Sequence, residues 1–388
     1  MSYASRTQHL KPEGAYQVLG RAQSLEASGH QIIHLEIGQP DFETFPNISL
    51  AGIKAITEGL TRYTPPIGMK SLREVIAEDA GRRRGLQFHP DQVVVSPGAK
   101  PNLFFPAQAL IEPGDEVIYP NPGFPTYEAM IRVAGGIPVA VPLLEENSFS
   151  FDLEAFHRLV NDRTRLIILN SPSNPTGGVI PQADLEQIAA AAQRHDCWVM
   201  SDEIYARIVY DNASVPSIAA LPGMLERTII VDGFSKTYAM TGWRLGFGIM
   251  PKELANVVQL MLTHSVGSTA HFVQVAGIEA LTGPQGQVDQ VVAEYQRRRD
   301  AIVDGLNAIP GVTCQRPQGA FYVFPNVKSF GLTSSELANL VLERAGVAVL
   351  PGDSFGEYGE GYLRLVYSNS LENIQIAVDK MSRVLQSL

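Results

Sequence analysis

The chain has 388 residues, of which 45% are hydrophobic and 18% are charged, and its formal net charge at pH 7 is −10. This length allows two or three domains with a large core, and the acidic balance argues against a nucleic-acid-binding surface. Two cysteines, Cys197 and Cys314, are too few for a disulfide framework or a cysteine-based metal site. Because no apolar run approaches a membrane span and the N-terminus lacks the apolar stretch of a signal peptide, we expect a cytoplasmic protein that contacts no membrane.

The N-terminal segment is expected to form an irregular arm over residues 1–13, ending in Lys11-Pro12-Glu13. A helix from about Ala15 to Ser28 should follow, because it carries spaced apolar residues and stops at a glycine. The apolar residues of 32–37 predict a short strand. This strand runs into a loop that starts at Gly38, where the missing side chain exposes backbone.

A second helix is predicted over Asn47–Glu58, and the two prolines after Tyr63 forbid its continuation. Tyr63 is therefore either a phenol donor at a binding site or an aromatic residue that packs a loop. Val93-Val94-Val95 predicts a strand, which ends in Ser96-Pro97-Gly98-Ala99-Lys100 before a helix through Leu110. A small-residue turn between a strand and a helix N-terminus suits an anion, because free amides and the helix dipole face it.

Further strands end in candidate polar and aromatic residues. The strand at 116–119 leads to Phe124, a flat side chain that either stacks on a heteroaromatic ligand or fills a loop. The apolar run 165–169 leads to a turn that contains Asn174.

Two later strands carry candidate charged groups at their ends. The strand at 197–200 ends at Asp202, which is either a site carboxylate or a helix cap. The strand at 228–231 delivers Lys236. The repeated alternation of strands and helices from about 90 to 250 predicts one mostly parallel, doubly wound sheet.

The C-terminal part, residues 312–388, reads as a separate α+β unit with strands at 321–324 and 362–366. Arg364 lies inside the second, otherwise apolar, strand. A cation in such a strand needs a partner or an anionic ligand.

Lys236 follows its strand at the edge of the sheet where ligands bind in open α/β folds. Desolvation and a nearby cation such as Arg244 would lower the pKa of this amine, and a neutral amine forms a Schiff base with an aldehyde. Arg244 also offers a planar fork to a phosphate. An aldehyde that carries a phosphate is pyridoxal 5'-phosphate, whereas the alternative is an ordinary surface lysine and arginine.

These residues together resemble the class I aminotransferases, the fold-type I pyridoxal-phosphate enzymes of the aspartate aminotransferase superfamily. The motifs that carry the resemblance are Asn174-Pro175-Thr176-Gly177, Asp202 with Tyr205, Gly233-Phe234-Ser235-Lys236, Gly242-Trp243-Arg244 and Arg364. The match extends over nearly the whole chain, and the order and spacing of the motifs make it specific. The resemblance implies a large cofactor-binding domain at 46–280, and a smaller α+β domain formed by 1–45 and 281–388 with the N-terminal arm.

The resemblance also implies roles for individual residues. Lys236 would hold pyridoxal 5'-phosphate as a Schiff base and then move the substrate proton as general base and acid. Asp202 would keep the pyridine nitrogen protonated, so that the ring accepts electrons. Asn174 and Tyr205 would hydrogen-bond the phenolic oxygen of the ring, and Phe124 would stack on its face.

The phosphate and the substrate would be held by further residues. The phosphate residues implied are Gly98, Ala99, Lys100 and Arg244, and Ser235 is a further cofactor-binding residue. Arg364 would bind the substrate α-carboxylate, helped by Gly38 and Asn174. Tyr63 would reach the phosphate of the neighbouring subunit, which implies a homodimer with active sites at the interface.

Two departures from the family pattern are visible. Gly233 replaces a serine or threonine that many relatives carry three residues before the lysine, and Ser235 is not expected to supply the lost hydroxyl. The segment 263–272 shows no arginine for a substrate side-chain carboxylate, which weakens a strict preference for aspartate. Tyr16, Phe124 and Tyr127 would suit a less charged substrate.

The activity expected is therefore transfer of an amino group between an L-amino acid and a 2-oxo acid by a ping-pong mechanism. A pyridoxal-phosphate-dependent lyase or synthase on the same scaffold stays open, because the same lysine and aspartate serve both chemistries. A cofactor-binding regulator is disfavoured by the acidic charge and by a chain that starts directly with the arm. A nicotinamide dehydrogenase is disfavoured because no strand opens into G-x-G-x-x-G.

Overall fold

The structure is a computed structural model of the chain that describes residues 4, 7, 10 and 12–388. Lys11, which belongs to the expected arm, lies outside the described residues. Pro12 and Glu13 are irregular, and helix α1 begins at Gly14.

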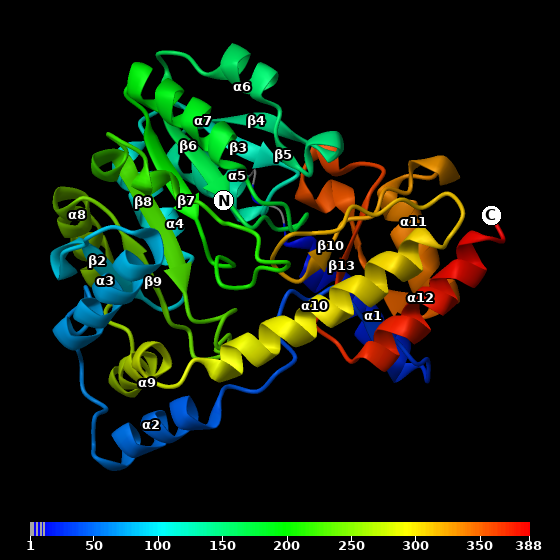
Figure 1. Cartoon of the computed structure of the whole chain (residues 1–388), viewed down its shortest axis with the longest axis horizontal. Helices are drawn as coiled ribbons and strands as arrows, with labels where there is room; N and C mark the ends of the chain where they lie inside the picture. The colour runs from blue at the N-terminus through cyan, green and yellow to red at the C-terminus, as the bar shows by residue number, and fades with distance from the viewer. Residues whose placement is uncertain (1–3, 5–6, 8–9, 11) are drawn as a thin grey trace.

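The larger part of the fold is a sheet in the strand order β2-β9-β8-β7-β6-β3-β4-β5 (Figure 1). Its strands are β2 (Val93–Ser96), β3 (Glu116–Asn121), β4 (Ile137–Leu144), β5 (Ser150–Phe151), β6 (Thr164–Asn170), β7 (Trp198–Asp202), β8 (Thr228–Gly233) and β9 (Gly246–Ile249). Strands β3, β4, β6, β7 and β8 pair in parallel, whereas β9 is antiparallel to β2 and β8, and β5 is antiparallel to β4. The predicted mostly parallel sheet is confirmed.

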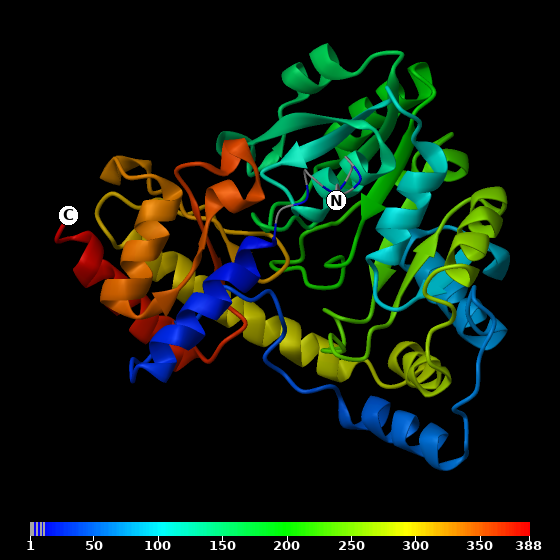
Figure 2. The same cartoon turned by 180° about the vertical axis from the view of Figure 1, so that it is seen from behind.

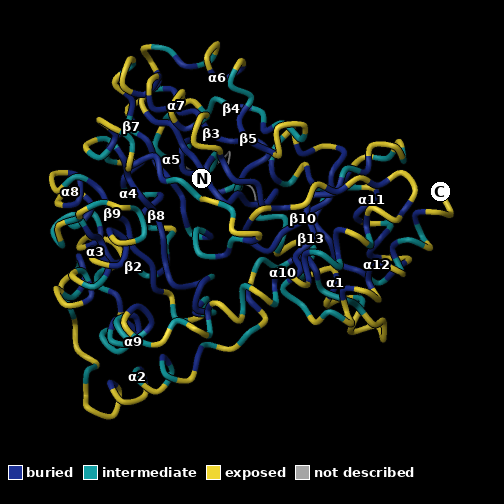
Figure 3. Tube along the Cα trace, viewed as in Figure 1, coloured by how far each residue is buried: buried dark blue, intermediate teal, exposed yellow. Residues whose placement is uncertain are grey.

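Helices cover both faces of this sheet. They are α3 (Lys70–Arg84), α4 (Pro101–Leu110), α5 (Thr126–Ala134), α6 (Leu153–Leu159), α7 (Gln182–Arg194), α8 (Lys252–Thr263) and α9 (His271–Thr282). In β6, Ile167 and Leu169 pack with α6 and α7, whereas Leu166 and Ile168 pack with α4, α5 and α8. Since successive side chains of a strand point to opposite faces, a continuous apolar strand implies two covered faces. Strands β2, β3, β8 and β9 are accordingly buried along their whole length, whereas β4, next to the sheet edge, is mostly half-buried (Figure 3).

The remaining strands lie in the C-terminal unit. β10 (Tyr322–Val323), β13 (Leu363–Val366) and β12 (Leu350–Pro351) form an antiparallel sheet, and β1 (Ile33–His34) pairs in parallel with β11 (Val347–Ala348). The helices of this unit are α1 (Gly14–Ala27), α10 (Gly286–Asn307), α11 (Ser334–Leu340) and α12 (Leu371–Leu385). The 22-residue helix α10 runs from the end of the large sheet into this unit (Figure 1).

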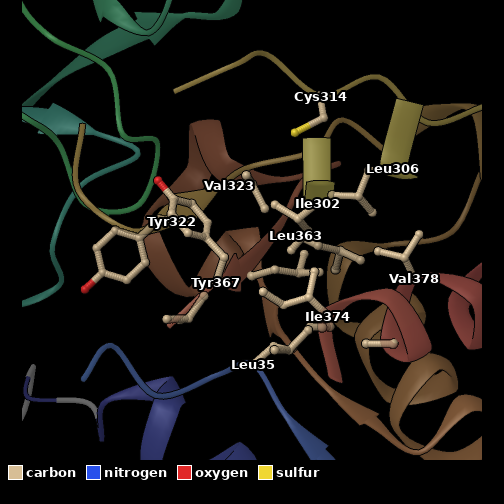
Figure 4. Packing of buried hydrophobic residues seen from close by; sticks show 14 of the residues in the cluster. Leu35, Ile302, Leu306, Cys314, Tyr322, Val323, Leu363, Tyr367, Ile374 and Val378 are labelled. Atoms are coloured by element: carbon tan, nitrogen blue, oxygen red, sulfur yellow. The ribbon is translucent and has the colours of Figure 1, made fainter. Parts of the chain in front are cut away.

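A separate apolar core holds the C-terminal unit together. Ile302 and Leu306 of α10 meet Leu363 of β13 and Ile374 of α12 in this core (Figure 4). Leu35, which follows β1, joins the same cluster, so the N-terminal segment packs with the C-terminal unit. Figure 2 shows α1 lying along this unit, where Ala22 packs against Leu342 and Ala348. We propose, as the sequence suggests, that residues 1–45 and 281–388 form one domain and 46–280 the other.

The structure differs from the sequence expectations in some elements. The strand expected at 32–37 is only two residues long, and the stretch around Phe124 enters helix α5 at Thr126. Helix α3 was not predicted, although Leu72, Ile76 and Ala80 are buried at four-residue spacing, because a run of charged residues surrounds them. None of the helices in the described part of the chain combines the length and the apolar character that a bilayer crossing requires.

Candidate active site

A cavity of about 570 Å³ lies where the large sheet meets the C-terminal unit. Strands β6, β7 and β8 are mutually parallel, so the residues that follow them meet at one edge of the sheet. The predicted site residues that line the cavity are Gly38, Ala99, Lys100, Phe124, Asn174, Asp202, Tyr205, Ser235, Lys236, Arg244 and Arg364. The fold therefore brings together residues that are up to 326 positions apart in the sequence, from Gly38 to Arg364.

Lys236 follows β8 and points its amine at the N-terminal loop. Its Nζ donates a hydrogen bond to the Gly38 carbonyl oxygen at 2.7 Å. Burial is the largest cause that lowers the pKa of Lys236, and together with the positive charges of Arg364 and Arg244 it brings that pKa to about 8. The amine is thus neutral far more often than a surface lysine, whose usual pKa is about 10.4.

Asp202 lies at the end of β7 and is held by two hydrogen bonds. The Tyr127 hydroxyl donates to Oδ2 at 2.8 Å, and the Ile204 amide donates to Oδ1 at 3.3 Å. Burial raises the pKa of this carboxyl to about 6, against the opposing effect of the Tyr127 hydrogen bond. A buried carboxylate that lines a cavity is stabilised by a cationic or protonated group on a ligand. Tyr127 therefore positions Asp202 rather than lying free for a substrate side chain.

Arg364 of β13 is a buried cation without a carboxylate partner. Its Nη1 donates to Asn174 Oδ1 at 3.2 Å, and its Nη2 donates to the Glu36 carbonyl oxygen. Its Nε has no hydrogen-bond partner, and no acidic side chain in the described part of the chain lies within ion-pair distance of it. Because an uncompensated buried charge is costly, this arrangement suits an incoming carboxylate, which can bind the guanidinium bidentately.

At the cavity, Tyr205, which follows β7 of the large sheet, contacts Tyr322 of β10 in the C-terminal unit. Their hydroxyl oxygens lie 2.6 Å apart, and burial raises the pKa of Tyr205 well above its usual value. The Tyr322 ring also covers the Arg364 guanidinium, at 4.8 Å from the ring centroid. A Cβ atom at Gly38 would lie 2.4 Å from the Tyr322 hydroxyl, so this loop position requires glycine. Tyr322 was not predicted as a site residue, because its strand reads as apolar core.

The start of α4 forms an anion cradle beside these groups. The amides of Gly98, Ala99 and Lys100 donate to no acceptor in the described part of the chain. The Arg244 guanidinium lies against Gly98, where a Cβ atom would come within 2.1 Å of Nη2. Gly98 also has a φ of +81°, which favours glycine. Free amides, a helix N-terminus and an arginine together suit a phosphate.

Phe124 and Gly233 are two further positions that the sequence analysis singled out near the cofactor site. Phe124 lines the cavity and meets the Tyr127 ring edge-on, with ring centroids 5.7 Å apart. A Cβ atom at Gly233 would lie 3.1 Å from Cα of Gly246 and 3.2 Å from Ile204. A side chain at Gly233 would therefore be tightly packed against β9 and Ile204, whereas Ser235 lines the cavity.

Two predicted residues are not in the wall of the cavity. Gly98 lies behind it against Arg244, as described above. Tyr63 is completely exposed, at 100% of its accessible surface, and is not one of the described residues that line the cavity of its own chain. Its neighbour Thr64 donates to the Thr269 carbonyl at 3.1 Å, and Thr269 borders a second hollow that Arg244 also lines.

Several lining residues escaped the sequence analysis as site residues. They are Glu13, Ala15, Ile37, Gln39, Leu103, Asn170, Ile204, Thr241 and Tyr322. Asn170 is the last residue of β6 and sits opposite Asp202 in the register, so the end-of-strand rule that found Asp202 also applied to it. Glu13 does not follow a strand, as the predicted site residues of the large sheet do, because it lies at the end of the N-terminal arm just before helix α1.

Comparison with known proteins gives a consistent result. The family model described as "Aminotransferase class I and II" matches residues 30–381. The chain is 38% identical to aromatic-amino-acid aminotransferase 2 of Thermococcus litoralis, covering 100% of this chain and 99% of that protein. It is also 38% identical to the aspartate aminotransferase of Geobacillus stearothermophilus, covering all of both chains. The solved aspartate aminotransferase of Thermus thermophilus with maleate superposes with a TM-score of 0.95, at 37% identity over 99% of this chain and 100% of that one.

Proposed function

The chain belongs to the class I and II aminotransferases and is an aminotransferase, and on that premise we propose that Lys236 binds pyridoxal 5'-phosphate and serves the transfer of an amino group between an L-amino acid and a 2-oxo acid. The family depends on this cofactor. The observation that carries the proposal is the convergence on one cavity of the Lys236 amine and the buried, unpaired Arg364. We also propose a cytoplasmic location, which cell fractionation tests.

The residues present fit the cofactor. The cradle of Gly98, Ala99 and Lys100 with Arg244 suits its phosphate, since the amides there have no acceptor among the residues that the structure describes. The buried Asp202 carboxylate suits the protonated ring nitrogen. Phe124 offers an aromatic face for the ring, and Asn174 and Tyr205 offer polar groups for its phenolic oxygen.

Each of these residues then has a defined part in the reaction. The bound cofactor supplies an aldehyde and a ring that accepts electrons from the substrate Cα. Arg364 holds the substrate α-carboxylate and so fixes the Cα–H bond relative to Lys236. The Nζ of Lys236, in its neutral form, would accept the proton from the substrate Cα as general base and then donate it again as general acid. Asp202 would hold the ring nitrogen in its protonated form.

The first test is the visible absorption spectrum of the purified holoenzyme before and after addition of single amino acids without an acceptor. A reactive amino acid should remove the absorbance of the lysine-bound cofactor and leave a pyridoxamine spectrum. A 2-oxo acid should then restore the first spectrum, because each half-reaction is reversible. A lyase would instead release ammonia and a 2-oxo acid without an acceptor, and that result would contradict the proposal.

We propose further that the protein is a homodimer in which Tyr63 completes the phosphate site of the partner subunit. Support comes from its full exposure beside the hollow that Arg244 lines. Helix α2 (Pro46–Thr57), at the periphery of the fold in Figure 1, also exposes Leu50 and Ile53, which are 63% and 57% accessible. An exposed apolar face on a helix is typical of a subunit interface.

Mixing two defective chains tests this arrangement. Tyr63→Ala should weaken cofactor binding roughly 10- to 100-fold, as loss of a charge-assisted hydrogen bond does. Lys236→Ala chains lack the essential amine but keep Tyr63. In a hybrid dimer, the Lys236 of the first chain would meet the Tyr63 of the second, so one normal site per hybrid should reappear in titrations with cofactor. If Tyr63 acts within its own chain, or if the protein sediments as a monomer, no normal site will form.

A further inference from the structure

One cation of the cavity is already paired, and its partner comes from the far N-terminal part of the chain. Lys100 Nζ lies 2.5 Å from Glu13 Oε1, and the two side chains are 47% and 32% exposed. Glu13 immediately precedes α1 and Lys100 immediately precedes α4, so the pair joins the starts of two helices. Both residues line the same cavity as Lys236 and Arg364. The partly exposed pair thus forms part of the wall of the site.

The other cations of the cavity have assigned ligands. Among the described residues, the lysines and arginines that line it are Lys100, Lys236, Arg244 and Arg364. Under the proposed function, Lys236 takes the cofactor, Arg244 the phosphate and Arg364 the α-carboxylate. Lys100 is therefore the cation left for a second substrate carboxylate, and Glu13 occupies it.

The surroundings of the pair are apolar. Ala15 and Tyr16 follow Glu13 along the start of α1, and both line the cavity. Leu103 lies one turn beyond Lys100 on α4 and lines it as well. The Lys100 amine also lies 5.1 Å from the centroid of the Phe124 ring. This wall suits an aromatic or aliphatic side chain, which buries apolar surface without disturbing the ion pair.

We propose that Glu13 is a specificity-determining residue that holds Lys100 and directs the site to amino acids with uncharged side chains. The proposal rests on the proposed aminotransferase function and deepens it. A dicarboxylic substrate has to displace Glu13 from Lys100 or place a second carboxylate beside it. Either event costs free energy that a neutral side chain does not pay, because like charges repel and a broken pair loses its attraction.

The test replaces Glu13 by glutamine, which removes the negative charge and keeps the shape. In the Glu13→Gln variant, the ratio of kcat/KM for aspartate to that for phenylalanine should rise about tenfold, since Lys100 becomes available to the side-chain carboxylate. The dissociation constant of succinate from the holoenzyme should fall by a similar factor relative to that of 3-phenylpropionate. Calorimetry measures this binding without turnover.

Two further variants isolate the cause. In a Lys100→Gln background, Glu13→Gln should produce no gain for aspartate or succinate, because the effect requires the freed amine. Glu154→Gln is the matched control: Glu154 pairs with Arg158 at 2.6 Å on the surface of α6 and does not line the cavity. It should leave both ratios as in the wild type.

The proposal is overturned if wild-type enzyme prefers aspartate to phenylalanine, or if Glu13→Gln leaves the two ratios unchanged or lowers them. An equal gain in the Lys100→Gln background would also overturn it. Failure of the proposed function looks different: no amino acid would convert the bound cofactor in wild-type enzyme. The binding ratio of succinate to 3-phenylpropionate would still report on Glu13 in that case.

Discussion

Replacing Lys236 with alanine is expected to lower turnover by about five orders of magnitude or more, the scale on which loss of a covalent catalytic group acts. The variant should also lose the absorbance of lysine-bound cofactor, since Nζ is the only atom assigned to that bond. Steady-state kinetics and the absorption spectrum measure the two effects independently. Lys252→Ala is the matched control, because Lys252 pairs with Asp91 on the surface at 3.2 Å and does not line the cavity. Normal turnover by the Lys236→Ala variant would end the assignment.

Because the pKa of Lys236 is lowered, the reactivity of its amine in the cofactor-free protein should depend on pH. The neutral amine accumulates as the pH rises through about 8 and is lost as the pH falls below it. At pH 7 the neutral fraction should be about 200 times that of an ordinary lysine with a pKa of about 10.4. Reductive labelling with a small aldehyde, followed by mass spectrometry, should show half-maximal labelling of Lys236 near pH 8. Lys54 and Lys70, which are 75% and 79% exposed, provide the comparison in the same sample.

Replacing Asp202 with asparagine should lower turnover by roughly 10²- to 10³-fold, as removal of one preorganised charged contact does in other active sites. Asparagine keeps the shape and can still accept the Tyr127 hydrogen bond, now 2.8 Å long, so the change isolates the negative charge. Cofactor attachment at Lys236 should persist, because the amine is untouched. The spectrum should therefore show bound cofactor while the conversion of amino acids slows.

Stopped-flow measurement of the half-reaction separates this effect from weaker substrate binding. The rate at saturating amino acid should fall, whereas the concentration for half-saturation should change little, because the contact proposed between Arg364 and the α-carboxylate is left intact. Asp91→Asn, a change in a surface carboxylate that is 41% exposed, is the control. If the Asp202→Asn variant reacts at the wild-type rate, Asp202 does not act on the ring nitrogen.

Much of the large sheet could be predicted from sequence, because its central strands are short apolar runs that can be recognised without knowing their partners. The apolar runs at 165–169 and 228–231 correspond to β6 and β8, which extend one or two residues beyond them. A strand that is covered on both faces of the sheet needs consecutive apolar residues, and such a run can be recognised in a single sequence. Helix α3 was missed because tertiary packing, rather than a clean apolar stripe, selects its buried face. β1 is shorter than predicted for a related reason: its extent depends on pairing with β11, which is more than 300 residues away in the sequence.

The sequence by itself determined the chemistry of this protein: a lysine after a β-branched strand, an aspartate after its neighbour, and the motifs of a known family. These signals are local, because each depends on a strand and the few residues that follow it. Only the tertiary structure decided which distant groups meet them. The Lys100–Glu13 pair, the Tyr205–Tyr322 contact and the Arg364–Glu36 hydrogen bond join residues 87, 117 and 328 positions apart. No periodic pattern in the sequence predicts such contacts, because they depend on how the large sheet and the C-terminal unit pack around the cavity.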